Sequence, residues 1–214
     1  MVAPLWAWRW SLDAVMYRSI FAIVGWMAVV SHSVAGTANV RVNDSVGKPL
    51  ADAVVFLESA AAKAANKPLT GIEVAQVAKQ FVPLVTVVPA GSMVHFPNRD
   101  TVRHHVYSFS AAKNFELKLY TGTPANPVLF DKPGIVVLGC NIHDSMAAWV
   151  LVVETPYFGK TNAAGDISLL NIPAGNYRLR TWHADLPVGA VPQDQPVSIG
   201  ATEVVNAVVK LSKP

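Results

Sequence analysis

Short runs of apolar residues, many of them alternating with polar residues, recur along the chain and predict β-strands. Alternation places one face of a strand against a core and the other face toward solvent. The segments 38–43 and 115–119 alternate in this way. Further β-forming runs bounded by turn residues lie at 53–58, 81–88, 106–109, 134–139, 148–153, 167–172, 177–182 and 204–211. Short strands separated by Gly, Pro and Asn turns predict an all-β protein, either a sandwich or a barrel.

The first 35 residues differ from the rest of the chain. Arg18 precedes an apolar run at 20–30, and the small residues Ser33 and Ala35 flank Val34. This order is typical of a bacterial secretory signal, and the run is shorter than the about 20 residues that span a membrane. We therefore expect residues 1–35 to be a signal peptide and the protein to be periplasmic or secreted. An uncleaved membrane anchor is the alternative.

Charge excludes one class of partner. The chain has 214 residues, with 17 Lys and Arg against 14 Asp and Glu, and no run of basic residues. Nucleic-acid binding usually requires a basic patch or stripe, so we expect no nucleic-acid partner. The length allows one or two domains with a sizeable apolar core.

The single cysteine requires an explanation, because exported proteins usually pair their cysteines. Cys140 follows the strand predicted at 134–139 and begins the sequence Cys-Asn-Ile-His-Asp-Ser-Met. Cys140, His143 and Met146 thus lie on one short loop, and thiolate, imidazole and thioether are the ligands of blue copper sites. An inert buried thiol, an intermolecular disulfide and a catalytic cysteine are the alternatives, but Met146 adds nothing to a nucleophile.

A second imidazole has two candidates. His104 and His105 are adjacent on a predicted strand, so their side chains face opposite sides and only one can point at the metal. His105 shares its face with Tyr107 and Phe109. This face pattern favours His105, and the residues alone leave the choice open.

Two segments resemble a known family of copper proteins. The segment 98–106, Asn-Arg-Asp-Thr-Val-Arg-His-His-Val, resembles plastocyanin and amicyanin, in which the first copper histidine follows an Asn by six residues. The segment 131–146 resembles their second copper motif, with the short C-x2-H-x2-M loop of amicyanin. Together, over about 80–158, they look most like the plastocyanin-like methylamine-utilisation proteins of bacteria.

The resemblance implies a cupredoxin-type Greek-key β-sandwich that carries single electrons between periplasmic redox partners, as a monomer with transient partners and no enzymatic activity. It implies one type 1 copper site, whose ligands would be His104, Cys140, His143 and Met146. This chain departs from the family by having His105 after the first ligand and Asn141 after the cysteine. We expect His105 and Asn141 to hydrogen bond across the two ligand loops and, with Asn98, to orient the ligands.

The flanking segments resemble a different family. The sequence at 40–57 is similar to the opening of carboxypeptidase-regulatory, transthyretin-like domains, and 161–177 matches their second half. This implies a second β-sandwich formed by 37–60 and 155–214, split by a cupredoxin domain at 65–154. One larger sandwich is the alternative.

Two other functions stay open from the sequence. A periplasmic copper-delivery protein would use the same ligands but exchange the metal readily. A metal-free module that binds carbohydrate or protein is the third possibility, because related sandwiches bind carbohydrate. Tyr157, Phe158 and Trp182 are the aromatic residues available for such a surface.

Overall fold

The computed structural model describes residues 35–212. These residues form seventeen strands and one short helix, α1 (Ala60–Ala64), so the predicted all-β fold class is confirmed. The predicted signal peptide lies outside the described residues except for its last residue, Ala35, which begins a strand. Within 35–212, no helix is long and apolar enough to cross a membrane.

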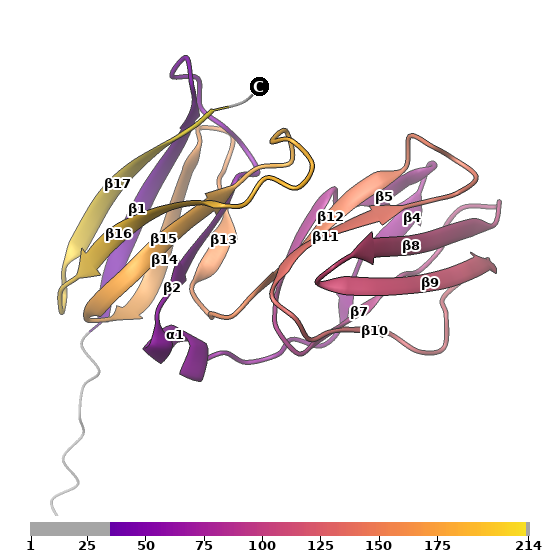
Figure 1. Cartoon of the computed structure of the whole chain (residues 1–214), viewed down its shortest axis with the longest axis horizontal. Coiled ribbons are helices and arrows are strands. Elements are labelled where there is room, and N and C mark those ends of the chain that lie inside the picture. Colours follow the sequence, from indigo (N-terminus) through magenta and orange to yellow (C-terminus); the bar gives the residue numbers. More distant parts are fainter. Residues whose placement is uncertain (1–34, 213–214) are drawn as a thin grey trace, which may run out of the picture. The chain divides into compact units, whose positions relative to one another are not determined.

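Two sheets are built from strands near the two ends of the described chain (Figure 1). The three-stranded sheet contains, in order, β14 (Asp166–Pro173), β1 (Ala35–Asp44) and β17 (Val204–Leu211). The four-stranded sheet contains β13 (Phe158–Lys160), β2 (Val54–Glu58), β15 (Gly175–Trp182) and β16 (Gln193–Ile199). These strands come from the two segments expected to form the split sandwich, whose boundaries stay a prediction.

Alternation along β1 explains how these two sheets pack. Val40 and Val42 are buried in a core that also receives apolar side chains of β2, β14 and β15. Arg41 points outward instead, and its guanidinium donates two hydrogen bonds to Asp166 on β14. Gly165 forms the turn before β14 with φ of 75°, and a Cβ there would lie 2.5 Å from the carbonyl oxygen of Val42. Only glycine suits this turn.

The remaining strands form two further sheets and a hairpin. The five-stranded sheet contains β6 (Val85–Pro89), β12 (Ala147–Val153), β11 (Gly134–Gly139), β8 (His104–Ser110) and β9 (Lys113–Tyr120). The three-stranded sheet contains β10 (Val128–Phe130), β7 (Ser92–His95) and β3 (Ile72–Glu73). The strands β4 (Ala75–Val77) and β5 (Gln80–Val82) pair as a hairpin. Only β6 and β12 are parallel within the five-stranded sheet.

A separate apolar core lies between these sheets. Phe96, Phe115 and Phe130 pack against one another with ring centroids 5.6 to 6.4 Å apart. Cys140 and Met146 belong to the same buried cluster. The cysteine thiol and the thioether are therefore held by core packing, which leaves little room for them to move.

Candidate metal centre

The loop between β11 and β12 carries three of the predicted ligands. Gly139 at the end of β11 pairs with Ala147 at the start of β12, so Cys140 and Met146 flank the last pair of the ladder. Both side chains are almost fully buried, with exposed fractions of 3% and 2%. The backbone N–H of Met146 donates to the carbonyl oxygen of His143 at 2.9 Å, which closes the loop. Strand pairing thus brings the ends of the heptapeptide together.

His104 meets this loop from the neighbouring strand β8. Its side chain is fully buried, and its Nδ1 lies 4.0 Å from the Sγ of Cys140. Its ring centroid lies 5.1 Å from that of His143. One ligand atom each from His104, Cys140 and His143 lies within 4.8 Å of the other two. Within residues 35–212, these three side chains form a group that can hold one metal ion.

His105 points away from this group. Its Nε2 lies 2.8 Å from the Oε1 of Glu116 on β9, and its ring packs on Tyr107 with centroids 5.5 Å apart. The expected hydrogen bond between His105 and Asn141 is absent from the described part of the chain. The reason is strand geometry, because β8 directs His104 inward and His105 to the opposite face of the sheet. Asn141 is exposed at the start of the loop.

Asn98 supports the loop that leads into His104. Its Nδ2 donates to the carbonyl oxygens of Val102 and Tyr120, at 2.9 and 2.8 Å. Its Oδ1 accepts from the backbone N–H of Asp100 at 3.0 Å. The Asn98 side chain therefore ties the loop both to itself and to the end of β9.

Asp100, which the sequence patterns did not indicate, contacts His104. Its Oδ2 lies 2.7 Å from the Nε2 of His104. The carboxylate also accepts hydrogen bonds from the backbone N–H groups of Ala78 and Lys79, at 2.7 and 2.9 Å. The hydrogen bond from Lys79, above all, lowers the pKa of Asp100. Asp100 lies only four positions before His104, but the turn that donates to it lies more than twenty positions upstream in another hairpin, and no sequence spacing indicates that part of the arrangement.

The environment of the group suits a metal better than an inert thiol. The Nδ1 of His143 is buried and has no hydrogen-bond partner. A buried polar atom without a partner costs about 1–3 kcal/mol, and a bound cation would satisfy it. Thiolate with two imidazoles is the donor set that suits copper and zinc, and the thioether of Met146, on the same loop and in the same buried cluster as Cys140, favours copper. Nearby, burial raises the pKa of Tyr120 to about 12, and its hydroxyl donates to the carbonyl oxygen of Phe96.

The aromatic residues considered for carbohydrate binding do not form an exposed platform. Trp182 is buried, and Tyr157 packs edge-on against Tyr177 at 6.2 Å. Phe158 is half-buried. These rings belong to the packing of the structure, which removes the main sequence argument for a carbohydrate-binding surface.

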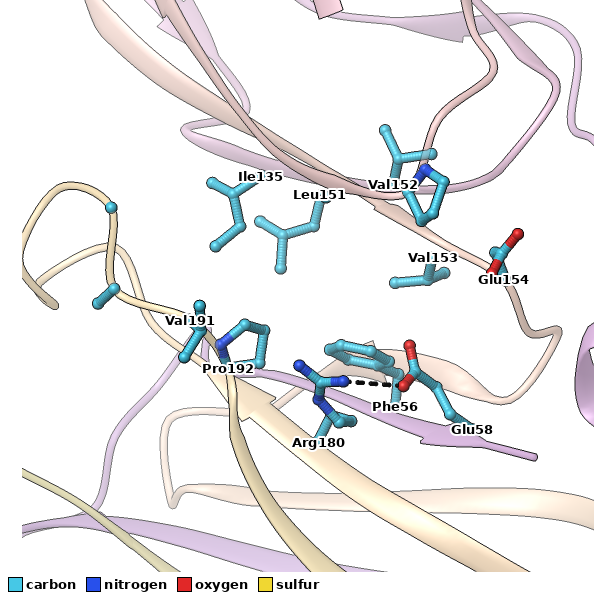
Figure 2. A pocket seen from close by; sticks show the side chains of 14 residues that line it. Phe56, Glu58, Ile135, Leu151, Val152, Val153, Glu154, Arg180, Val191 and Pro192 are labelled. Atoms are coloured by element: carbon cyan, nitrogen blue, oxygen red, sulfur yellow. Dashed lines mark hydrogen bonds and ion pairs between the residues drawn. The ribbon is translucent and has the colours of Figure 1, made fainter. Parts of the chain in front are cut away.

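A pocket of about 470 Å³ lies apart from the histidines and the cysteine (Figure 2). Its walls are largely apolar, with Phe56, Ile135 and Leu151 among the side chains that line it. Its charged residues include Arg180 and Glu58, which pair with each other at 3.0 Å. Glu154 is the other charged residue in its lining.

Comparison with known proteins identifies cupredoxins among the similar solved structures. No protein-family model matches the chain, and no curated protein matches it. A copper-containing nitrite reductase from Thermus scotoductus is 26% identical over 41% of this chain, with a TM-score of 0.37. The chain spans only 23% of the length of that reductase. A purple cupredoxin from Nitrosopumilus maritimus is 20% identical, covering 38% of this chain and 99% of its own, with a TM-score of 0.34. Amicyanin from Paracoccus versutus is 16% identical over 46% of this chain and 97% of its own, with a TM-score of 0.34.

Proposed function

We propose that this chain is an exported blue copper protein that carries single electrons between redox partners. The observation that carries the proposal is the convergence of His104, Cys140 and His143 around a buried thiol, with ligand atoms within 4.8 Å of one another. Met146 would complete the proposed ligand set with a weakly donating thioether. Bound copper would supply one-electron chemistry by cycling between its two oxidation states.

The role of the protein is to hold these ligands still. Cys140, His143 and Met146 lie on a loop that is closed by β-pairing at Gly139 and Ala147, and His104 begins a strand of the same sheet. A site whose ligands are fixed by packing moves little when the charge on the metal changes. Small rearrangement is what rapid electron transfer requires.

Access to the site favours electron exchange over metal exchange. His104 and Cys140 are buried, whereas His143 is half-buried and its neighbour Ile142 is 47% exposed. A partner can therefore approach the His143 side of the loop without displacing a ligand. Small interfaces are sufficient for transient redox partners. A delivery protein would need more open ligands, so we place copper delivery second. We propose no enzymatic activity for the chain.

The test is addition of Cu(II) to the metal-free protein, followed by absorption and electron paramagnetic resonance spectroscopy. We expect one equivalent of copper to bind and to produce an intense thiolate-to-copper band in the visible spectrum. Cys140→Ser removes the thiolate with little change in volume and is expected to abolish the band while circular dichroism shows an unchanged fold. Failure of the folded protein to bind copper, or a band that survives Cys140→Ser, would contradict the proposal.

Voltammetry separates the carrier from the delivery protein. A carrier is expected to show a reversible one-electron couple and to retain copper when challenged with a chelator. Rapid loss of copper to the chelator would favour delivery instead. Cell fractionation and sequencing of the mature N-terminus test export and cleavage near Ala35.

A further inference from the structure

A carboxylate is fixed directly behind the buried histidine of the candidate copper site. Asp100 Oδ2 lies 2.7 Å from the Nε2 of His104, and its side chain is only 14% exposed. His104 itself is fully buried, so its ring nitrogens are shielded from bulk solvent. The other ring nitrogen, Nδ1, faces the Sγ of Cys140. The imidazole therefore bridges the carboxylate and the thiol.

Three donors hold this carboxylate in place. The backbone N–H groups of Ala78 and Lys79 each donate to it, at 2.7 and 2.9 Å, and His104 supplies the third contact. Ala78 and Lys79 form the turn between β4 and β5 with φ values of 52° and 58°. Positive φ is unfavourable for residues other than glycine and asparagine. Hydrogen bonding to Asp100 compensates for that conformation and links the hairpin to the metal site.

The charge on Asp100 determines which nitrogen of His104 carries the proton. An ionised carboxylate has no proton to donate, so the Nε2 of neutral His104 must carry the proton and donate to it. The lone pair of Nδ1 is then free on the side of Cys140, as metal ligation requires. A hydrogen bond to a carboxylate also makes the imidazole a stronger electron-pair donor to a metal.

We propose that Asp100 is a positioning residue of the copper site, which sets the tautomer of His104 and lowers the reduction potential of the bound metal. This inference rests on the proposed function. The potential falls because a fixed negative charge and a stronger donor both favour Cu(II) over Cu(I). No comparable carboxylate contacts His143, whose Nδ1 has no partner in the described structure.

The test is Asp100→Asn, which keeps the shape of the side chain and removes its charge. The amide can donate to the Nε2 of His104, which would move the proton to Nδ1 and oppose metal ligation. We expect nitrogen-15 NMR of the metal-free variant to show that change of tautomer. In the copper-loaded variant we expect Cu(II) affinity to fall by about 10- to 100-fold and the reduction potential to rise. An unchanged tautomer, affinity and potential would overturn the proposal.

Glu116→Gln is the matched control. Glu116 contacts the Nε2 of His105 at 2.8 Å, so the same change is made at the neighbouring carboxylate–histidine pair on the opposite face of the sheet. We expect this variant to retain the Cu(II) affinity and potential of the unaltered protein. A shift equal to that of Asp100→Asn would show that any nearby charge has the same effect and would overturn the proposal.

A second control separates positioning from turn stabilisation. Ala78→Asn with Lys79→Gly places residues that favour positive φ in the turn, so that the turn is stable without its hydrogen bonds to Asp100. Added to Asp100→Asn, these changes are expected to restore the free energy of unfolding but not the tautomer or the potential. Restoration of the potential as well would show that Asp100 acts only through the turn. If the unaltered protein binds no copper, the proposed function fails, while the tautomer of the metal-free protein still decides whether Asp100 orients His104.

Discussion

Met146 allows the packing of the site to be separated from its ligand chemistry. The side chain is 2% exposed and belongs to the buried cluster that contains Cys140 and Leu138. Met146→Ala removes Cγ, Sδ and Cε. At about 0.8 kcal/mol for each buried methylene-sized group, the transfer term is about 2.5 kcal/mol. The cavity left behind adds to this term, so we expect the free energy of unfolding to fall by about 3–4 kcal/mol in total.

Met146→Leu is the partner variant, because it removes the thioether while nearly conserving volume. We expect Met146→Leu to lower the free energy of unfolding by less than about 1.5 kcal/mol. Urea denaturation of the two metal-free variants, followed by circular dichroism, measures this difference. If Met146→Ala costs no more than Met146→Leu, the close packing of this side chain is contradicted.

Copper-loaded Met146→Leu then tests the role of the side chain as a ligand. Loss of a weak donor destabilises Cu(II) more than Cu(I), so we expect the reduction potential to rise and the visible band to shift. The protein should remain folded and should still bind copper through the other three ligands. An unchanged spectrum and potential would refute the assignment and leave Met146 as a core residue only.

Three further predictions address the neighbours of the site and the pH dependence of stability. Gly139→Ala would place a Cβ 2.7 Å from the Cζ of Tyr107, so we expect the ring to be displaced. Urea denaturation should then show the free energy of unfolding to fall by about 1–2 kcal/mol. In a Tyr107→Ala background the same change should not lower it. His104→Ala is expected to abolish the copper-thiolate band and His105→Ala to retain it; the opposite result in absorption spectra would reverse the ligand assignment. The pKa of Asp166 is lowered from its ordinary value of 3.8 by the hydrogen bond from its arginine partner and by their opposite charges. Its stabilising effect is therefore present above pH 3.8 and lost as the pH falls through the folded pKa. Urea denaturation should show Asp166→Asn to be less stable at neutral pH and equal to the unaltered protein in strong acid, and a constant difference at all pH values would contradict this origin.

Local patterns were sufficient for the fold class and for three of the four proposed ligands. Alternation and β-forming runs depend only on neighbouring residues, so strands such as the one that ends at Gly139 were predicted from sequence, whereas β10, β13 and β16 were not. The same holds for Cys140, His143 and Met146, because a seven-residue segment between paired strands must form one loop. The export signal and the boundaries of the two sandwiches stay predictions.

The alternation of side chains along a strand left the choice between His104 and His105 to the tertiary structure. Alternation shows that the two side chains face opposite sides of β8 but does not show which side is the core. The bulky face with Tyr107 and Phe109 favoured His105, yet Phe109 is 77% exposed and the Tyr107 ring lies over Gly139. The aromatic residues instead stack along the outer face of the sheet.

The sequence by itself determined an all-β chain and one loop with a thiol, an imidazole and a thioether, because both depend on residues close together along the chain. The tertiary structure decided that His104 joins Cys140 and that Asp100 lies behind His104. It also brought the turn at Ala78 and Lys79 against that carboxylate. The contact of His104 with Cys140 and the contacts of Asp100 with Ala78 and Lys79 join segments that are distant in sequence, and only the pairing and packing of the sheets bring such segments together. Asp100 and His104 are four positions apart, and the conformation of the loop between them decides that their side chains meet.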